Sequence, residues 1–201
     1  MAQYAAKLAT GQNYAPPNHR AALILDTYHG ACSAKATAKG FYLSAFLRET
    51  ASNGQHLEGY GPYRDFKDYP QQEAIRLIAE CARRLYPDAM LREGIRRIGW
   101  SVFPTLLSTM IGKVVFGALG DSIPAVARNA SRGFSVSLNG GTCEALRVSA
   151  NEAELRVEDC FLFPDCFLVG VFEGAVAHYG KDAQVEVANV GKGRCDYLIR
   201  W

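Results

Sequence analysis

The hydrophobic pattern of the chain changes its period once, near Gly133. Before that point apolar residues recur at steps of three and four, as at Ile75 and Ile78, which predicts helices. After it they alternate with polar residues, as at Leu155 and Val157, which predicts antiparallel strands with one covered face. Helices and strands are therefore segregated along the chain, and the expected fold class is α+β. We expect a helical N-terminal half packed on an antiparallel sheet, with one helix before a C-terminal β-hairpin.

The helical half divides at its prolines and glycines. Expected helices cover 39–50, 70–85, 88–102, 105–119 and 121–127. Pro104 should separate the third from the fourth, because proline lacks the amide that continues a helix. The fourth should bury Leu106, Met110, Val114 and Leu119.

The second half begins with the alternation of Phe134, Val136 and Leu138, which predicts a strand. Asn139-Gly140-Gly141 should turn it into a hairpin whose return strand holds residues 146–148. A further strand is expected around 155–157. A helix then follows Asp165, and two strands at 185–187 and 195–201 close the chain.

Composition indicates one globular domain. The chain has 201 residues, a net charge of +2 and 49 % apolar residues, which gives no electrostatic reason to expect nucleic acid. Residues 1–35 show little pattern and are expected to form an N-terminal arm before a single domain over 36–201. No signal-peptide core is present, and the six scattered cysteines suggest reduced thiols and a cytoplasmic protein. The apolar stretch 98–120 contains Lys113 and Pro104. We therefore expect a buried core helix or helix pair, broken near Pro104, and no membrane span.

No motif for phosphate binding, zinc binding or nucleophilic catalysis occurs in the sequence. If the protein were an enzyme, the nearest available groups would be those around the last predicted helix. These catalytic candidates are Cys166, Asp165, Glu173 and His178. Cys160, Cys166 and Cys195 are the candidate metal ligands, since the first two flank the start of that helix and the third opens the last strand. A role as small buried hydrophobic residues is the alternative for all three.

Aromatic residues are frequent in both halves, and they could fill the core or line an apolar pocket between helices and sheet. The expected ligand-binding residues are Trp100, Phe103, Leu107, Met110, Phe134, Phe163, Phe167 and Phe172.

Four stretches resemble a paralogous family of unknown function found mainly in myxobacteria. They are AKGFYLSAFL (38–47), ARRLYPDAMLREGIRRIGW (82–100), VARNASRGFSVSLNGG (126–141) and FEGAVAHYGKDAQVEV with the terminal YLIRW (172–201). That family resembles, more distantly, the 4-vinyl reductase domain and, with it, haem–nitric-oxide-binding domains and transport-protein-particle subunits. The resemblance implies a hydrophobic pocket between helices and sheet, and a homodimer.

The resemblance also bears on cofactors. Cys166 and Cys195 could match two of the zinc-binding cysteines of vinyl-reductase-type domains, but a third would fall near Val187, which cannot bind metal. Haem-binding relatives need a histidine in the middle of the chain, and none occurs between His56 and His178. We therefore predict no cofactor, with zinc as a minor alternative and haem as improbable. Cys32 and Cys81 are candidates for the acyl-accepting thiol of some transport subunits.

These observations favour a cytoplasmic sensing domain that holds a hydrophobic small molecule between helices and sheet. Binding would reposition the terminal hairpin or a dimer face. One alternative is an interaction protein with a solid core, whose face bearing Arg92, Arg96 and Arg97 contacts a partner or a second copy. A third is an enzyme that acts on a specialised metabolite, although the sequence favours a protein that is not an enzyme.

Overall fold

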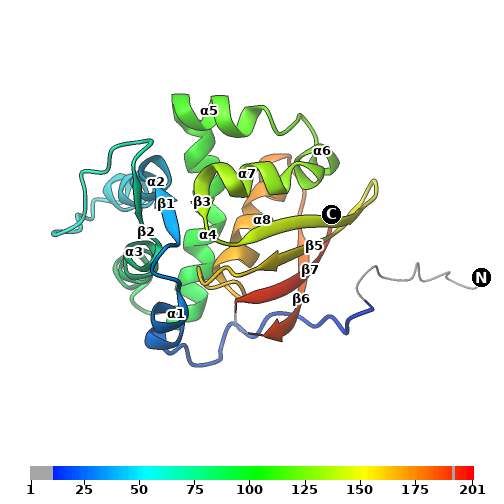
Figure 1. Ribbon diagram of the computed structural model, residues 1–201, viewed down its shortest axis with the longest axis horizontal. Helices are drawn as coiled ribbons and strands as arrows, with labels where there is room; N and C mark the ends of the chain where they lie inside the picture. Colours follow the sequence, from blue (N-terminus) through cyan, green and yellow to red (C-terminus); the bar gives the residue numbers. More distant parts are fainter. Residues whose placement is uncertain (1–10, 192) are drawn as a thin grey trace, which may run out of the picture.

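The computed structural model describes residues 11–191 and 193–201, which form helices and two antiparallel sheets (Figure 1). The helices are α1 (Leu25–Ala31), α2 (Gly40–Ser52), α3 (Gln71–Leu85), α4 (Leu91–Ser108), α5 (Met110–Gly117), α6 (Ile123–Arg128), α7 (Ala130–Ser137) and α8 (Phe167–His178). The strands are β1 (Thr37–Lys39), β2 (Asp68–Pro70), β3 (Leu138–Asn139), β4 (Thr142–Val148), β5 (Glu152–Glu158), β6 (Gln184–Gly191) and β7 (Arg194–Arg200). The α+β prediction is confirmed.

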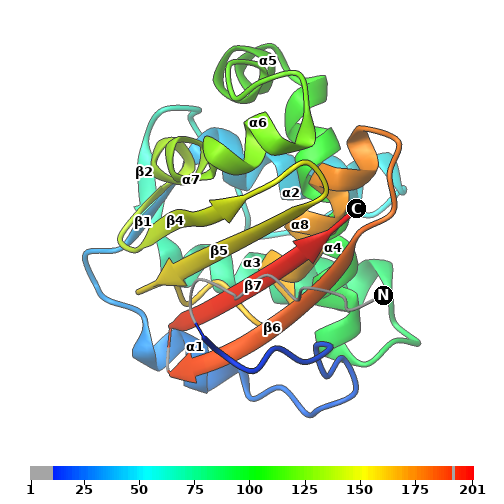
Figure 2. The ribbon, with the colours of Figure 1, turned by 90° about the vertical axis from the view of Figure 1, so that its right-hand side faces the viewer.

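The larger sheet has the strand order β4-β5-β7-β6, and every neighbouring pair is antiparallel. Helix α8 covers its inner face, where the rings of Phe172 and Tyr197 lie 4.8 Å apart. Helix α4 lies behind α8, and α2 and α3 lie on the far side of α4 (Figures 1 and 2). The core therefore runs continuously from the sheet through α8 to the N-terminal helices.

Helices α4 and α8 approach each other at backbone distance because glycines face the contact. A Cβ atom added to Gly170 would lie 1.9 Å from the carbonyl oxygen of Arg96, and one added to Gly174 would lie 2.0 Å from that of Trp100. Gly99 serves the same purpose on α4. No side chain fits in these spaces, so the spacing of the glycines sets how deeply α8 packs.

The boundary between α4 and α5 differs from the prediction. Helix α4 continues through Pro104 to Ser108, and the chain bends by 101° before α5. The bend occurs at Thr109, whose hydroxyl donates to the carbonyl of Leu106 and accepts from the amide of Gly112, both at 2.8 Å. These two hydrogen bonds end one helix and cap the next.

The proline in α4 coincides with the close contact to α8. Pro104 cannot donate to the carbonyl of Trp100, four residues earlier, and this is the carbonyl that Gly174 approaches. The helix therefore continues past Pro104. The carbonyl of Trp100, which has no amide donor at position 104, is covered by the backbone of Gly174.

The sharp turn also changes which residues of α5 are buried. Leu106 and Leu119 lie in the core, as predicted, at 3 % exposed each. Met110 and Val114 are 83 % and 72 % exposed, so their predicted burial is wrong. That prediction assumed one helix from 105 to 119, whereas the bend turns this face of α5 outward.

The predicted strand at residues 134–138 is wrong for most of its length. Residues 130–137 form α7, and the Ser137 hydroxyl donates to the carbonyl of Gly133 at 3.0 Å. Only Leu138 begins a strand, and it pairs with Ala38 of β1 in a small sheet of order β2-β1-β3. The glycine turn after Asn139 therefore links two different sheets and makes no hairpin.

The described part of the N-terminal region, residues 11–35, contacts the rest of the chain at both of its ends. Ala15 exchanges two backbone hydrogen bonds with Val187 on the β6 edge, at 3.0 and 2.8 Å. The Tyr28 hydroxyl donates to a carboxylate oxygen of Asp165 at 3.0 Å. The division into an arm over 1–35 and a domain over 36–201 stays a prediction, and residues 1–10 lie outside the described residues.

The position of His19 in this segment predicts a pH dependence. Burial first, and then the positive charge of Arg96, lower the pKa of His19 in the folded chain, while Glu93 acts in the opposite direction. The unfolded chain therefore binds more protons, and stability should fall as the pH drops below about 6.5. We expect the melting temperature of the wild type to decrease more than that of His19→Gln between pH 7.5 and pH 5.5. Equal decreases would contradict this role for His19.

Among the described helices, none alone has the length and hydrophobicity of a membrane-spanning helix. Helices α4 and α5 reach that length and hydrophobicity only when they are combined, and a bend of 101° separates them.

Candidate functional site

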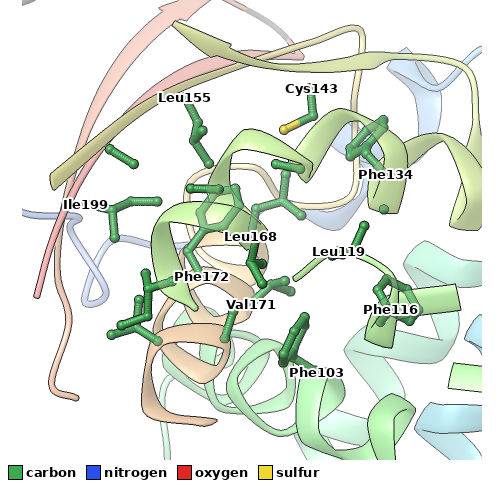
Figure 3. Close-up of a pocket in the computed structure, with 18 of the residues that line it drawn as sticks. Phe103, Phe116, Leu119, Phe134, Cys143, Leu155, Leu168, Val171, Phe172 and Ile199 are labelled. Atoms are coloured by element: carbon green, nitrogen blue, oxygen red, sulfur yellow. The ribbon is translucent and has the colours of Figure 1, made fainter. Parts of the chain in front are cut away.

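An apolar cavity of about 130 Å³ lies between the larger sheet and the helices that face it (Figure 3). The C-terminal half of α4 and helices α5 to α7 form one side, with Phe103, Phe116 and Phe134. Helix α8 and the inner face of the sheet form the other. The cavity therefore occupies the junction of the helical half and the sheet half of the chain.

The side chains that line the cavity from the sheet and from α8 point inward. Those of the strands do so because side chains alternate between the two faces of a sheet, and those of α8 because they recur at helical spacing. Leu155 of β5 and Ile199 of β7 point to the inner face, while their neighbours point outward. On α8, Leu168, Val171 and Phe172 face the cavity (Figure 3). The glycines of α8 contact α4, so one face of the helix packs on α4 while another face lines the cavity.

The lining is almost entirely hydrocarbon. Among the described lining residues, none has a carboxylate, amino, guanidinium or imidazole side chain. The hydroxyls of Ser137 and Tyr179 donate to the carbonyls of Gly133 and Gly120, at 3.0 and 2.9 Å. An environment of this kind favours an uncharged, largely apolar ligand.

The residues predicted to bind ligand fall in several places. Phe103, Phe134 and Phe172 line the cavity. Phe163 and Phe167 are fully buried elsewhere in the core, where their rings contact those of Tyr28 and Phe46.

The other three predicted residues lie outside this lining. Leu107 faces a second, more open hollow beside the end of α8. Trp100 and Met110 are 49 % and 83 % exposed. The predicted lining consists mainly of aromatic residues and therefore omits aliphatic residues such as Leu155 and Ile199. The alternation of the strands already indicated that these two residues face the helices.

Two of the catalytic candidates form ion pairs that join α4 to α8 or to the segment before it. A carboxylate oxygen of Asp165 lies 2.5 Å from Arg92, and Glu173 binds Arg96 through two contacts of 2.7 and 2.8 Å. Both arginines belong to α4. These carboxylates therefore have structural partners outside the cavity.

The other two catalytic candidates are separated by most of α8. Cys166 is fully buried at the start of the helix, and burial raises the pKa of its thiol. His178 is exposed at the other end, with its ring 5.9 Å from that of Phe103. The structure does not bring the four candidates together at one site.

The three candidate metal ligands, Cys160, Cys166 and Cys195, are free and fully buried. Within the described residues, no group of three or more His, Cys, Asp or Glu side chains could hold a metal ion. The other three cysteines, including Cys32 and Cys81, are also free and buried.

Burial of the thiols predicts low reactivity in the folded protein. Burial raises the pKa of Cys81, Cys143, Cys160 and Cys195 to about 12 in each case, so little thiolate exists near neutral pH. We expect a chromogenic disulfide reagent at about pH 8 to modify the native protein slowly, and all six cysteines after unfolding. A thiol that reacts at once in the native protein would contradict this burial.

The arginines of α4 that were assigned to an interface are engaged within the chain. Besides the pairs of Arg92 and Arg96, Arg97 binds Glu93 at 3.0 Å. Arg97 is the most exposed of the three, with 52 % of its side chain accessible. A dimer or partner face on this helix stays a prediction.

Comparisons with known proteins address the fold and the family. A family model described as "Protein of unknown function (DUF2378)" matches residues 35–201. No curated protein matches the chain. The expected membership of a family of unknown function is therefore confirmed, whereas nothing in these comparisons supports a myxobacterial origin or a vinyl-reductase relationship.

Solved structures with the same fold include H-NOX proteins. One from S. oneidensis in the Fe(II)NO ligation state has 15 % identity and a TM-score of 0.61, covering 81 % of this chain and 98 % of its own. The NMR structure of an H-NOX domain from Shewanella oneidensis in the Fe(II)CO state has 17 % identity and a TM-score of 0.61, with 81 % and 97 % covered. A third, reported for modulation of haem redox potential through porphyrin distortion, has 14 % identity and a TM-score of 0.56, with 81 % and 92 % covered. At these identities the likeness establishes the fold.

The same structures correct the prediction about cofactors. We predicted no cofactor, with zinc as a minor alternative, and judged haem improbable because no histidine lies between His56 and His178. Proteins of this fold are solved with iron-bound NO or CO, and one is described by its haem. The prediction that haem is improbable is wrong, because a missing histidine at one position does not exclude cysteine or tyrosine side chains, which can also bind haem iron.

Proposed function

The chain belongs to the DUF2378 family of unknown function, and we propose that it is a ligand-binding sensor domain whose cavity holds a largely apolar small molecule. The observation that carries this proposal is the cavity between α8, helices α5 to α7 and the larger sheet. The chain has the fold of H-NOX proteins, and this likeness supports a sensing role for the domain.

The size and lining of the cavity support a small, uncharged ligand. A volume of about 130 Å³ is close to that of engineered apolar cavities, of about 150 Å³, that bind benzene. Entry of a larger molecule would require movement of the surrounding helices. Helices α5 to α7 lie beyond the bend at Thr109 and form one wall of the cavity, so they are the helices that would have to move.

Haem is one of the candidate ligands. The lining is apolar like the porphyrin macrocycle, but a cavity of about 130 Å³ is far smaller than a porphyrin, so haem would enter only if the surrounding helices moved. Cys143, Tyr42 and Tyr179 supply a thiol and two phenols, groups of the types that bind haem iron. Burial raises the pKa of the Cys143 thiol to about 12, so iron binding there would have to displace a proton. The two carboxylates of haem would have to reach solvent, since the described lining includes no cationic side chain.

The test is to measure binding to the purified protein. We expect an organic ligand to be detected by native mass spectrometry, or benzene to bind to ligand-free protein as followed by NMR. Titration with haemin, followed by its absorption spectrum, is the second arm. Saturable haemin binding would identify a porphyrin ligand, whereas binding of neither probe and no co-purified ligand would overturn the proposal.

A matched pair of variants locates the binding site. Ala175 lines the cavity from α8, and Ala51 is exposed on α2. Ala175→Leu should fill the cavity and reduce ligand affinity about tenfold or more, because a leucine side chain would occupy the ligand's space. Ala51→Leu should leave affinity unchanged. Equal affinity in both variants would place the ligand elsewhere.

A further inference from the structure

Tyr42 differs from the other polar residues that line the cavity. It belongs to α2, is 6 % exposed, and packs its ring edge-on against Phe46, with centroids 5.2 Å apart. Its hydroxyl forms no hydrogen bond among the described residues, although the hydroxyls of buried tyrosines normally have a partner. The hydroxyl oxygen is also not among the fully buried unpaired polar atoms of the described residues, so it keeps some accessible surface.

The other hydroxyls in the lining already donate to backbone carbonyls. Ser137 donates to Gly133 at 3.0 Å, and Tyr179 donates to Gly120 at 2.9 Å. Trp201 also lines the cavity, and its indole nitrogen donates to Ala150 at 3.0 Å. Of these lining groups, only Tyr42 has a strong donor left for a ligand.

The hydroxyl of Tyr42 remains a donor at all ordinary pH values. Burial raises its pKa well above the usual range, and the charge of a nearby Cys160 thiolate would raise it further. In a hydrocarbon lining, an unused donor is costly until an acceptor reaches it. The cavity therefore combines an apolar wall with a single available hydrogen-bond donor.

From this combination we infer that the ligand is an uncharged, mainly apolar molecule with one hydrogen-bond acceptor, which binds the hydroxyl of Tyr42. This inference rests on the proposed function, because it specifies the chemistry of the molecule in the same cavity. It excludes a pure hydrocarbon as the preferred ligand. Carbonyl compounds, ethers and neutral aromatic nitrogen heterocycles are the classes that meet the requirement.

Benzene and pyridine provide a matched test because they have nearly the same shape and only pyridine has an acceptor. The dissociation constants of both are measured by NMR titration for the wild type, Tyr42→Phe and Tyr179→Phe at about pH 7.5, where pyridine is neutral. The quantity compared is the ratio of the two constants in each protein, so the hydration of the probes cancels. We expect Tyr42→Phe to weaken pyridine relative to benzene by about threefold to tenfold, as for one neutral hydrogen bond.

Tyr179→Phe is the control, since that hydroxyl lines the same cavity but is already bonded to Gly120. Its ratio should equal that of the wild type. Stability gives an independent readout. Tyr42→Phe removes no internal hydrogen bond and should keep or raise the melting temperature, whereas Tyr179→Phe should lower it.

The outcomes separate this inference from the proposed function. If both probes bind and the ratio is the same in all three proteins, Tyr42 is not the ligand's donor, and the inference fails while the cavity remains a binding site. If neither probe binds to any of the three folded proteins and no ligand co-purifies, the proposed function itself fails. If the ratio changes only in Tyr179→Phe, the donor is Tyr179.

Discussion

Replacing Gly170 by alanine is expected to destabilise the protein by about 3 kcal/mol, because the new methyl group has no space. Its carbon would lie 1.9 Å from the carbonyl oxygen of Arg96 and 2.8 Å from the amide nitrogen of Trp100. Both atoms belong to the backbone of α4, so relief requires the two helices to move apart. Unfolding by urea, followed by circular dichroism, measures the change in free energy.

Gly117→Ala is the matched control for this substitution. Gly117 is the last residue of α5, and a Cβ atom added there would meet no atom within 4 Å. Alanine should leave stability unchanged or raise it slightly, because alanine favours the helix over glycine. An equal loss of stability in Gly170→Ala and Gly117→Ala would contradict the prediction. The loss would then come from replacing any glycine and not from the close contact between α4 and α8.

The sequence predicted the α+β class correctly because each half of the chain has a sustained hydrophobic period. Helix α3 shows this well, since Ile75 and Ile78 are fully buried at the expected helical spacing. Strand β5 shows it for the sheet, with Leu155 and Val157 facing inward. Long periodic segments are specified by local pattern, and these two elements needed no information from the rest of the fold.

The predictions that failed concern segments whose conformation depends on distant partners. Alternation over Phe134, Val136 and Leu138 spans only five residues, and a short helix is equally compatible with it. Helix α7 lies against the end of α5, because a Cβ atom on Gly133 would be 3.0 Å from the side chain of Leu119, which follows α5. The pairing of Leu138 with Ala38 joins residues that are far apart in sequence, and no local pattern indicates it.

The candidate site was predictable only in part for a related reason. Its general place, between helices and sheet, follows from the order of the elements and from their apolar faces. The choice among apolar residues does not, since Phe103 lines the cavity while the equally apolar Phe167 fills the core. Which of the two occurs depends on the depth at which α8 packs, and the α4–α8 glycine contacts set that depth.

Replacing Asp165 by asparagine should produce the other large effect, a loss of about 3 kcal/mol of stability or more. Asp165 is the counterion of Arg92, and their side chains are 16 % and 10 % exposed. The Nε atom of Arg92 is already without a hydrogen-bond partner among the described residues. Removing the carboxylate charge would therefore leave a buried guanidinium without compensation.

The exposed pair of Lys39 and Asp68 is the matched control, with a separation of 2.9 Å. Asp68→Asn should change stability little, because solvent screens this pair. The double variant Arg92→Met with Asp165→Asn should recover much of the loss, since no buried charge then remains and methionine keeps most of the apolar stem. If the double variant were as unstable as Asp165→Asn alone, the cost would come from another contact of Asp165, and the hydrogen bond from Tyr28 would be the first to test by Tyr28→Phe.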